Sequence, residues 1–428
     1  MNQYVLTASR MFFTKMAWLI LLAGLAFYSC KPRSNSGKDQ TVQNGKLIKA
    51  EKIGEFDTGK LRRILNEELQ EFLAGAPMPF DSFRGKYAEP ANSITLYKLT
   101  FQSSVPEKNN EPVEQTGLVA IPAAVAPGTP MVSYQHGTVF AKNEVPSNIE
   151  SSMETKLMLA QFGGQGYIVI AADYHGLGES PYPNAYFSRR STEQSCLDMH
   201  TAAREFLEQQ KIQIGHFFLL GWSQGAYNTL VFLRRLEQAR VPVVATVTAA
   251  TPADPNFFIS HGILNPRPAD AVWLPAGLNN MLYSYENYMG VTGLAARAIK
   301  PQYLQASKDF YEFKIGFPEF LQKTTPKIVE YLNPEFVEEV RLGSSPFCQA
   351  LNQAEGYRWK SKIPLRSYYG AKDECIPPTL GRLAIEYQQA MGKTNGELAF
   401  AGENADHRCT YTVALYDAKA WLDAFIKK

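Results

Sequence analysis

The residues with the clearest chemical meaning are Gly221-Trp222-Ser223-Gln224-Gly225. They follow an apolar run at residues 216–220 and precede a stretch with helical periodicity. A serine placed in this way is typical of a nucleophile elbow, a strained strand-to-helix turn that lifts the serine hydroxyl out of a sheet. We therefore predict that Ser223 is a nucleophile. The alternative is an ordinary glycine-rich turn, because a chain of this length contains such a pentapeptide by chance about one time in ten.

A serine that transfers acyl groups needs a base to take its proton and an acid to orient that base. His407 follows the last predicted strand and precedes the C-terminal helix, where the base belongs. Asp373 follows the strand before it, where the acid belongs. Glu374 and Asp254 are the alternatives for the acid. The order serine, acid, histidine at three successive strand ends predicts a catalytic triad of Ser223, Asp373 and His407.

The chemistry also needs N–H donors for the oxyanion that forms on the attacked carbonyl. The amide that follows the nucleophile, Gln224, is the first expected donor. The second is expected in the loop after residues 131–135, where Thr138 is the preferred donor and Gly137 the alternative. His136 in the same loop is expected to shape it rather than to act as a base.

Strands and helices that alternate along the chain must position these residues. A mostly parallel central sheet flanked by helices, in the α/β class, is therefore expected. The predicted strands are residues 94–101, 116–121, 131–135, 167–172, 217–220, 243–250, 364–369 and 397–400. The predicted helices are residues 61–73, 150–162, 192–209, 226–236, 379–391 and 411–426.

The alternation stops over residues 254–362, which are rich in aromatic residues, proline and asparagine. Such a length is too great for a loop in a compact domain, so it predicts a helical cap inserted late in a core of residues 91–253 and 363–428. The aromatic residues of the cap are expected either to line an apolar pocket or to form the cap's own core. They are Phe257, Phe258, Trp273, Tyr283, Tyr285, Phe310, Tyr311, Phe313, Phe317 and Phe320.

With these motifs the chain resembles the α/β-hydrolase superfamily, and most closely the secretory lipases of the Candida lipase A type. The resemblance rests on the Tyr-Gln-His-Gly-Thr stretch that starts at Tyr134, the Gly-Trp-Ser-Gln-Gly stretch and the late cap. Ala226 departs from it, because that group often has a further glycine there. The resemblance implies a serine esterase or lipase that acts on a small-molecule ester and needs no cofactor. A serine peptidase and a non-catalytic binding module remain alternatives.

The charge balance of the chain, 43 Lys and Arg against 41 Asp and Glu, gives a net charge of +2. Binding to nucleic acid is not expected, because nucleic-acid binders carry concentrated basic patches. The sequence has no Cys-x-x-Cys motif and no histidine-rich cluster, so no metal site is predicted.

The N-terminus predicts export. Residues 1–30 combine positive charge with a short apolar run, as in a signal peptide, and a run this short is not expected to span a membrane. Residues 27–30 resemble a bacterial lipoprotein cleavage site, so Cys30 is the expected lipidation site and membrane contact would come through this anchor. The expected location is the periplasm, the outer membrane or the cell surface; without lipidation the protein would be secreted. Residues 31–90 are expected to form a polar tether, through residue 52, followed by an N-terminal helix.

Four further cysteines follow Cys30, which in an exported chain permits disulfides. Cys375 lies two residues after Asp373, and Cys409 lies two residues after His407. Because the acid and the base must approach each other, we predict a disulfide between Cys375 and Cys409.

Overall fold

A nine-stranded sheet runs through residues 43–427, the part of the chain that this computed structural model describes. The strands are β1 (Leu47–Phe56), β2 (Ile94–Val105), β3 (Glu111–Pro122), β4 (Thr129–Gln135), β5 (Ile168–Ala172), β6 (Ile214–Trp222), β7 (Ala245–Ala249), β8 (Leu365–Gly370) and β9 (Gly396–Gly402). Their order across the sheet is β1-β2-β3-β5-β4-β6-β7-β8-β9. The pairings β1–β2, β2–β3 and β3–β5 are antiparallel. The five pairings that follow, from β5 to β9, are parallel.

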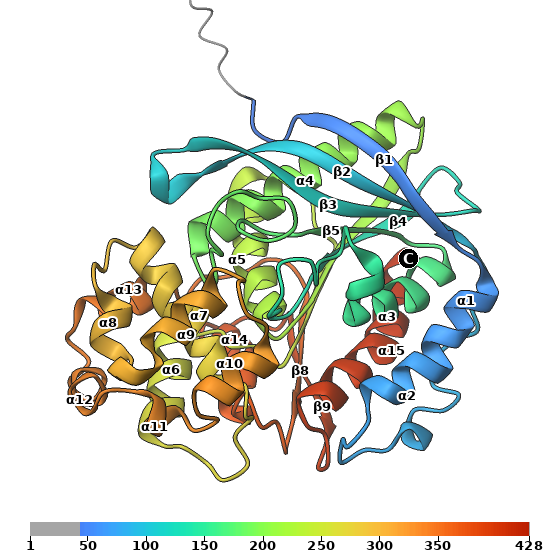
Figure 1. The fold of residues 1–428 in the computed structure, drawn as a ribbon. Coiled ribbons are helices and arrows are strands. Elements are labelled where there is room, and N and C mark those ends of the chain that lie inside the picture. Colours follow the sequence, from blue (N-terminus) through green and yellow to red (C-terminus); the bar gives the residue numbers. More distant parts are fainter. Residues whose placement is uncertain (1–42, 428) are drawn as a thin grey trace, which may run out of the picture. The chain divides into compact units, whose positions relative to one another are not determined.

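Fifteen α-helical segments accompany these strands within residues 43–427 (Figure 1). Those of the core are α1 (Thr58–Arg63), α2 (Leu69–Phe72), α3 (Met153–Gln161), α4 (Arg189–Gln209), α5 (Gln224–Ala239), α14 (Pro378–Ala390) and α15 (His407–Ile426). Those between β7 and β8 are α6 (Pro255–Leu264), α7 (Leu274–Tyr288), α8 (Leu294–Ala298), α9 (Leu304–Tyr311), α10 (Phe317–Lys323), α11 (Ile328–Tyr331), α12 (Pro334–Leu342) and α13 (Pro346–Gln353).

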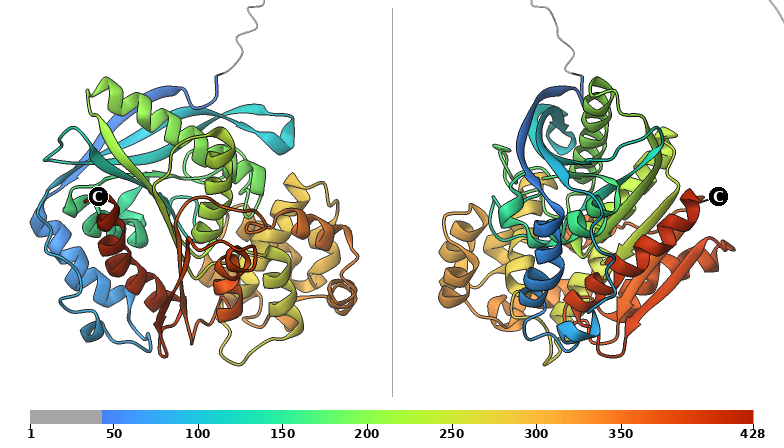
Figure 2. Two further views of the ribbon diagram at one scale, coloured as in Figure 1. Left: turned by 180° about the vertical axis from the view of Figure 1, so that it is seen from behind. Right: turned by 90° about the vertical axis from the view of Figure 1, so that its right-hand side faces the viewer.

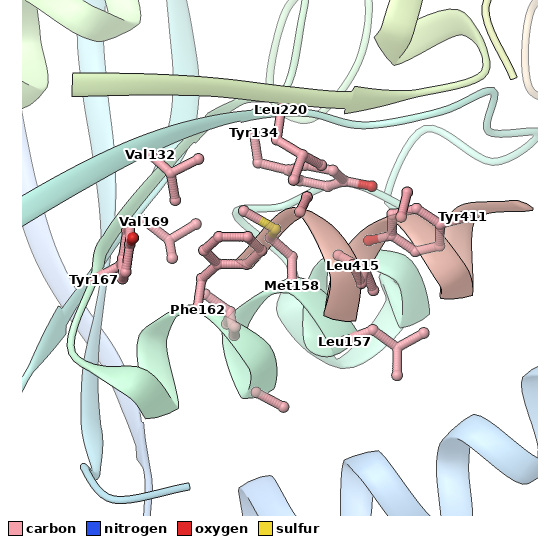
Figure 3. Packing of buried hydrophobic residues seen from close by; sticks show 14 of the residues in the cluster. Val132, Tyr134, Leu157, Met158, Phe162, Tyr167, Val169, Leu220, Tyr411 and Leu415 are labelled. Atoms are coloured by element: carbon pink, nitrogen blue, oxygen red, sulfur yellow. The ribbon is translucent and has the colours of Figure 1, made fainter. Parts of the chain in front are cut away.

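The central strands are buried on both faces, which explains their continuous apolar sequences. In β6, Phe218 and Leu220 pack in a cluster with α3 and α15, whereas Phe217 and Leu219 pack in a cluster with α4 and α5. Figure 3 shows the first of these clusters, where side chains of the sheet meet those of α3 and α15. Helices therefore cover both faces of the sheet, so a site can open at the ends of its strands.

The helices from α6 to α13 gather into a cap beside the sheet (Figures 1 and 2). The cap has a hydrophobic core of its own, in which Tyr285, Phe310 and Phe320 are fully or almost fully buried. The sequence left open whether the cap aromatics form a core or line a pocket, and for these three the structure shows a core. The predicted fold, a mostly parallel sheet flanked by helices with a late helical cap, is confirmed.

One expected segment has a different structure. Residues 31–52 were expected to form a tether, but Leu47–Phe56 forms the edge strand β1, which pairs antiparallel with β2. Most of its side chains are exposed and several are charged, because only one partner strand covers it. An exposed edge strand lacks the apolar pattern that identifies a buried strand, which is why its sequence resembles a tether.

The predicted signal peptide and Cys30 lie outside the described residues. Within residues 43–427, no helix is long and apolar enough to cross a membrane.

Candidate active site

Ser223 lies at the turn between β6 and α5, with φ of 59° and ψ of −124°. Non-glycine residues rarely adopt a positive φ of this kind, so the turn stores strain. The two flanking glycines are required by space. A Cβ atom on Gly221 would come within 2.2 Å of the Gly225 carbonyl oxygen, and one on Gly225 within 1.9 Å of the Gln135 carbonyl oxygen. The local geometry is that of a nucleophile elbow.

A continuous line of hydrogen bonds joins Ser223, His407 and Asp373. The Ser223 Oγ atom lies 2.8 Å from His407 Nε2, and His407 Nδ1 lies 3.0 Å from both carboxylate oxygens of Asp373. All three side chains are buried. With the proton of the ring on Nδ1, directed at the carboxylate, Nε2 is free to accept the serine proton.

The sheet explains how residues so distant in sequence meet. Gly221 of β6 pairs with Thr248 of β7, Tyr368 of β8 pairs with Ala249 of β7, and β9 lies next to β8. Because these strands are parallel, their carboxyl ends lie along one edge of the sheet. Ser223, Asp373 and His407 each follow one of those ends.

The two other carboxylates considered as the acid have different partners. Glu374 accepts a hydrogen bond from the backbone N–H of His407, 3.0 Å away, and not from its ring. Asp254 caps α6 by accepting from the Phe257 N–H. The structure therefore brings Asp373, and neither alternative, to the imidazole.

Asp373 is held in place by the backbone. Its Oδ1 atom accepts hydrogen bonds from the Cys375 N–H at 2.9 Å and the Ile376 N–H at 2.7 Å. Burial by itself would lower the pKa of His407, but the charge of Asp373 and its hydrogen bond outweigh burial and raise the pKa above its usual value. The pair is thus arranged to stabilise an imidazolium.

Two backbone amides near Ser223 are free to bind an oxyanion. Gln224 is the first residue of α5, where amides have no acceptor within the helix. Thr138 lines the same cavity as Ser223. Neither the Gln224 N–H nor the Thr138 N–H donates a hydrogen bond within the described part of the chain. Both backbone N–H groups therefore remain available as the oxyanion donors that the sequence predicts.

The backbone N–H of Gly137, the alternative donor, is already hydrogen-bonded. Its N–H binds the Oε1 atom of Glu154, a buried carboxylate on α3, at 2.7 Å. The expectation that Gly137 could serve as an oxyanion donor is therefore corrected. The neighbouring His136 is fully buried and stacks on Tyr174, with 4.2 Å between ring centroids, in keeping with a role in shaping the loop.

A cavity of about 260 Å³ opens at the triad. Its lining residues are Thr138, Trp222, Ser223, Trp273, Glu374, His407 and Arg408. A second, mostly apolar cavity lies between α6, α7 and the loop after β8, and Trp273 lines both. A larger cleft of about 710 Å³ along β3 contains no triad residue, so its size does not make it the site of this chemistry.

The predicted disulfide does not form. Cys375 and Cys409 are both buried free thiols. Cys375 packs with Ile376 and Leu380, whereas Cys409 belongs to the cluster of α3 and α15, its Sγ atom 3.8 Å from the Met78 carbonyl oxygen. The prediction was wrong because the contact between Asp373 and His407 is made by their side chains, which leaves the following residues in different clusters.

Two residues of the site were not predicted as site residues from the sequence. Glu154 lies in a segment expected only to be helical, and Arg408 was not considered. No local signal distinguishes Glu154 from the exposed Glu150 nearby, because only the packing of α3 against the loop after β4 brings it to Gly137. Within residues 43–427, no group of His, Cys, Asp or Glu side chains is placed to hold a metal ion.

Solved structures of hydrolases share this fold. No protein-family model and no curated protein matches the sequence. A putative hydrolase from Legionella pneumophila is 22% identical, with a TM-score of 0.77 over 90% of this chain and 99% of that one. The rice cell wall degrading esterase LipA from Xanthomonas oryzae is 17% identical, with a TM-score of 0.74 over 90% and 99%.

Candida antarctica lipase A in its closed state is also similar, at 17% identity and a TM-score of 0.61 over 89% of this chain and 84% of that one. At these identities the likeness is one of fold. It covers the core and the cap together, since about nine tenths of the chain is matched each time. The nine-stranded, cap-bearing chain therefore has the α/β-hydrolase fold of these esterases and lipases.

Proposed function

We propose that this protein is an exported serine hydrolase that cleaves carboxylic esters through an acyl-enzyme. The observation that carries the proposal is the hydrogen-bonded line from Asp373 through His407 to Ser223, which ends at a cavity that Ser223 and Thr138 both line. The esterase and lipase activities of proteins with the same fold support the ester as the substrate class.

In the proposed reaction, Ser223 Oγ attacks the ester carbonyl carbon while His407 Nε2 takes its proton. The Gln224 and Thr138 amides bind the oxyanion of the tetrahedral intermediate. The intermediate collapses, His407 returns the proton to the leaving alkoxide, and the alcohol departs. Water then attacks the acyl-enzyme with His407 as base, which releases the acid and restores the serine. Asp373 orients the imidazole and stabilises its charged form throughout.

The small cavity favours an ester over a polypeptide. Two tryptophans, Trp222 and Trp273, form part of its wall, and about 260 Å³ is little room for an extended peptide chain. A serine peptidase with the same triad would need a wider cleft. Activity on amide or peptide substrates at a rate comparable to that on esters would favour the peptidase.

Labelling with a fluorophosphonate is the most direct test, because the reagent reacts with activated serines. We expect labelling of the intact protein, no labelling of Ser223→Ala, and hydrolysis of p-nitrophenyl esters only by the former. A folded protein that neither takes the label nor hydrolyses any ester of a chain-length series would be the non-catalytic binding module instead.

Export and lipid anchoring form part of the proposal and rest on the sequence of residues 1–30. A lipid on Cys30 would place the enzyme at a membrane surface. Metabolic labelling with a radioactive fatty acid should mark the protein and should fail for Cys30→Ser. Absence of label in the unchanged protein, together with release into the medium, would indicate secretion without an anchor.

A further inference from the structure

The carboxylate of Glu154 is buried beside the loop that carries the proposed oxyanion donor. Glu154 is the second residue of α3, and only 9% of it is exposed. Its Oε1 atom accepts the Gly137 N–H at 2.7 Å. A carboxyl group is costly to bury, and burial raises its pKa to about 8. A side chain kept in the interior at such a cost invites a functional explanation.

No cation neutralises this carboxyl group. No lysine or arginine within residues 43–427 forms an ion pair with it, and the nearest basic atom is Nδ1 of His136, at 3.9 Å. Burial lowers the pKa of His136 to about 4, so its ring is neutral at ordinary pH. The other titratable groups that face Glu154 are Tyr134, Glu144, Tyr174, His407 and Tyr411. The amide of Gly137 is thus the principal hydrogen-bond partner of the side chain.

The Gly137 peptide is confined from two sides. A Cβ atom on Gly137 would lie 3.0 Å from Glu154 Oε2 and 3.2 Å from the Trp222 ring, so the peptide lies close against both side chains. Trp222 directly precedes Ser223, and it also stacks on Tyr411 at 4.8 Å between centroids. The Tyr411 hydroxyl donates to the Glu154 carbonyl oxygen at 2.7 Å. Glu154 therefore connects the loop after β4 with α15, which begins at His407, and Trp222 lies against the same Gly137 peptide.

We propose that Glu154 is a positioning residue that fixes the Gly137 peptide and thereby holds the Thr138 N–H where the oxyanion forms. The proposal rests on the proposed ester hydrolysis and adds to it a residue that touches neither the substrate nor the triad. Its hydrogen bond directs the Gly137 amide to α3, whereas the N–H of the next residue, Thr138, which lines the cavity, has no acceptor within the described part of the chain.

Two substitutions of similar size separate this role from general packing. Glu154→Gln keeps an acceptor for the Gly137 N–H, and it resembles the uncharged acid. Glu154→Met fills the same space without an acceptor. Loss of one oxyanion donor costs about 10²- to 10³-fold in kcat in well-studied enzymes. We expect kcat on a p-nitrophenyl ester to fall about 100-fold in Glu154→Met and less than about fivefold in Glu154→Gln, with KM changed less than about threefold in both.

Met158→Ala is the matched structural control. Met158 is fully buried on the same helix, belongs to the apolar cluster of Figure 3 and makes no hydrogen bond to the loop after β4 within the described residues. It should lower the melting temperature and leave kcat nearly unchanged. A Glu154→Met protein that keeps kcat would overturn the proposal. So would a Glu154→Gln protein as impaired as Glu154→Met, because the acceptor would then not matter.

If Glu154→Met does not fold, Gly137→Ala tests the same peptide from the other side. Its methyl group would press on Glu154 and Trp222, and a loss mainly in kcat is expected; an unchanged kcat would again overturn the proposal. An unchanged protein without esterase activity or fluorophosphonate labelling would refute the proposed function itself. An active protein whose kcat does not change on substitution of Glu154 would instead refute only the positioning role.

Discussion

The Nε2 atom of His407 lies 2.8 Å from the Oγ atom of Ser223, although 184 residues separate them in the chain. Each residue stands where a strand has ended and a helix starts: α5 begins at Gln224, and α15 begins at His407. Parallel strands place such junctions along one edge of a sheet. The contact between Ser223 and His407 therefore follows from the order of the strands in the sheet. The cap contributes Trp273 to the wall of the adjoining cavity.

Replacing Asp373 by Asn should reduce kcat by about 10⁴-fold, as expected when the imidazole of a triad loses its carboxylate. His407 acts as a base only when neutral, so activity falls as the pH drops through its pKa. Asp373 raises that pKa, and its removal should move the rising limb of the kcat/KM profile to lower pH. The profile can be measured with a p-nitrophenyl ester from pH 5 to 9.

Glu374→Gln is the matched control for that substitution. The two carboxylates are adjacent, but Glu374 accepts only the backbone N–H of His407, and an amide oxygen can replace it there. The loss should stay below about tenfold. The rising limb should move to lower pH by less than in Asp373→Asn, because Asp373 contributes more than Glu374 to raising the pKa of His407. If Glu374→Gln instead lost most of its activity and Asp373→Asn kept it, the acid would be Glu374.

Ser223→Gly should be more stable than Ser223→Ala by about 1 kcal/mol. Both lose the hydroxyl and its bond to His407, but only glycine adopts the observed φ of 59° and ψ of −124° without strain. Urea unfolding of the two inactive proteins measures the difference.

At an ordinary helical position the order reverses, because glycine is less stable than alanine by about 1 kcal/mol. Gln238, exposed near the end of α5, provides the comparison through Gln238→Gly and Gln238→Ala. If alanine is also the more stable residue at position 223, the serine backbone is not strained.

Trp273→Ala should shift substrate preference to longer acyl chains. The Trp273 ring lines both the cavity at Ser223 and the apolar cavity of the cap, so its removal should join the two. We expect kcat/KM to fall for acetyl esters and to rise at least several-fold for octanoyl esters, since each buried methylene contributes about 0.8 kcal/mol.

Tyr283→Ala removes another aromatic residue from the cap, one that stacks on Tyr311 and lines neither cavity. It should leave the chain-length preference unchanged. An identical profile for both variants would mean that the cap cavity does not receive the substrate.

Glu154→Gln should make stability less dependent on pH. The folded-state pKa of Glu154, about 8, lies above the value of 4.5 for an unburied glutamate. Between these values the folded state holds a proton that the unfolded state has released, so this group makes stability fall as the pH rises from about 4.5 to 8. The slope it contributes is about 1.4 kcal/mol per pH unit.

Urea unfolding at several pH values in this window compares the variant with the unchanged protein. Glu150→Gln, which removes an exposed carboxylate paired with Lys60, should keep the slope of the unchanged protein. Equal slopes in all three proteins would show that Glu154 is ionised in the folded state over the whole window.

Much of this arrangement is encoded in local sequence patterns. The apolar runs that became β5 and β6, and the helical periodicity behind Ser223, depend on neighbours a few residues apart, so each could be recognised without the fold. Asp373 and His407 could be predicted as the acid and the base because each follows a strand, and the residues that follow parallel strands meet at one edge of the sheet. The late cap was visible because the alternation of strands and helices stops over residues 254–362.

The tertiary structure decided what depends on packing between distant segments. Only the contact of α3 with the loop after β4 shows that Gly137 is bound by Glu154, and only the surroundings of Cys375 and Cys409 show two separate thiols. The strand β1 was missed because its exposed edge needs no apolar pattern. Local sequence thus determined the elements and the order of Ser223, Asp373 and His407 along the chain. Long-range packing, whose energy no short window of sequence contains, decided which amide of the loop after β4 is bound by Glu154.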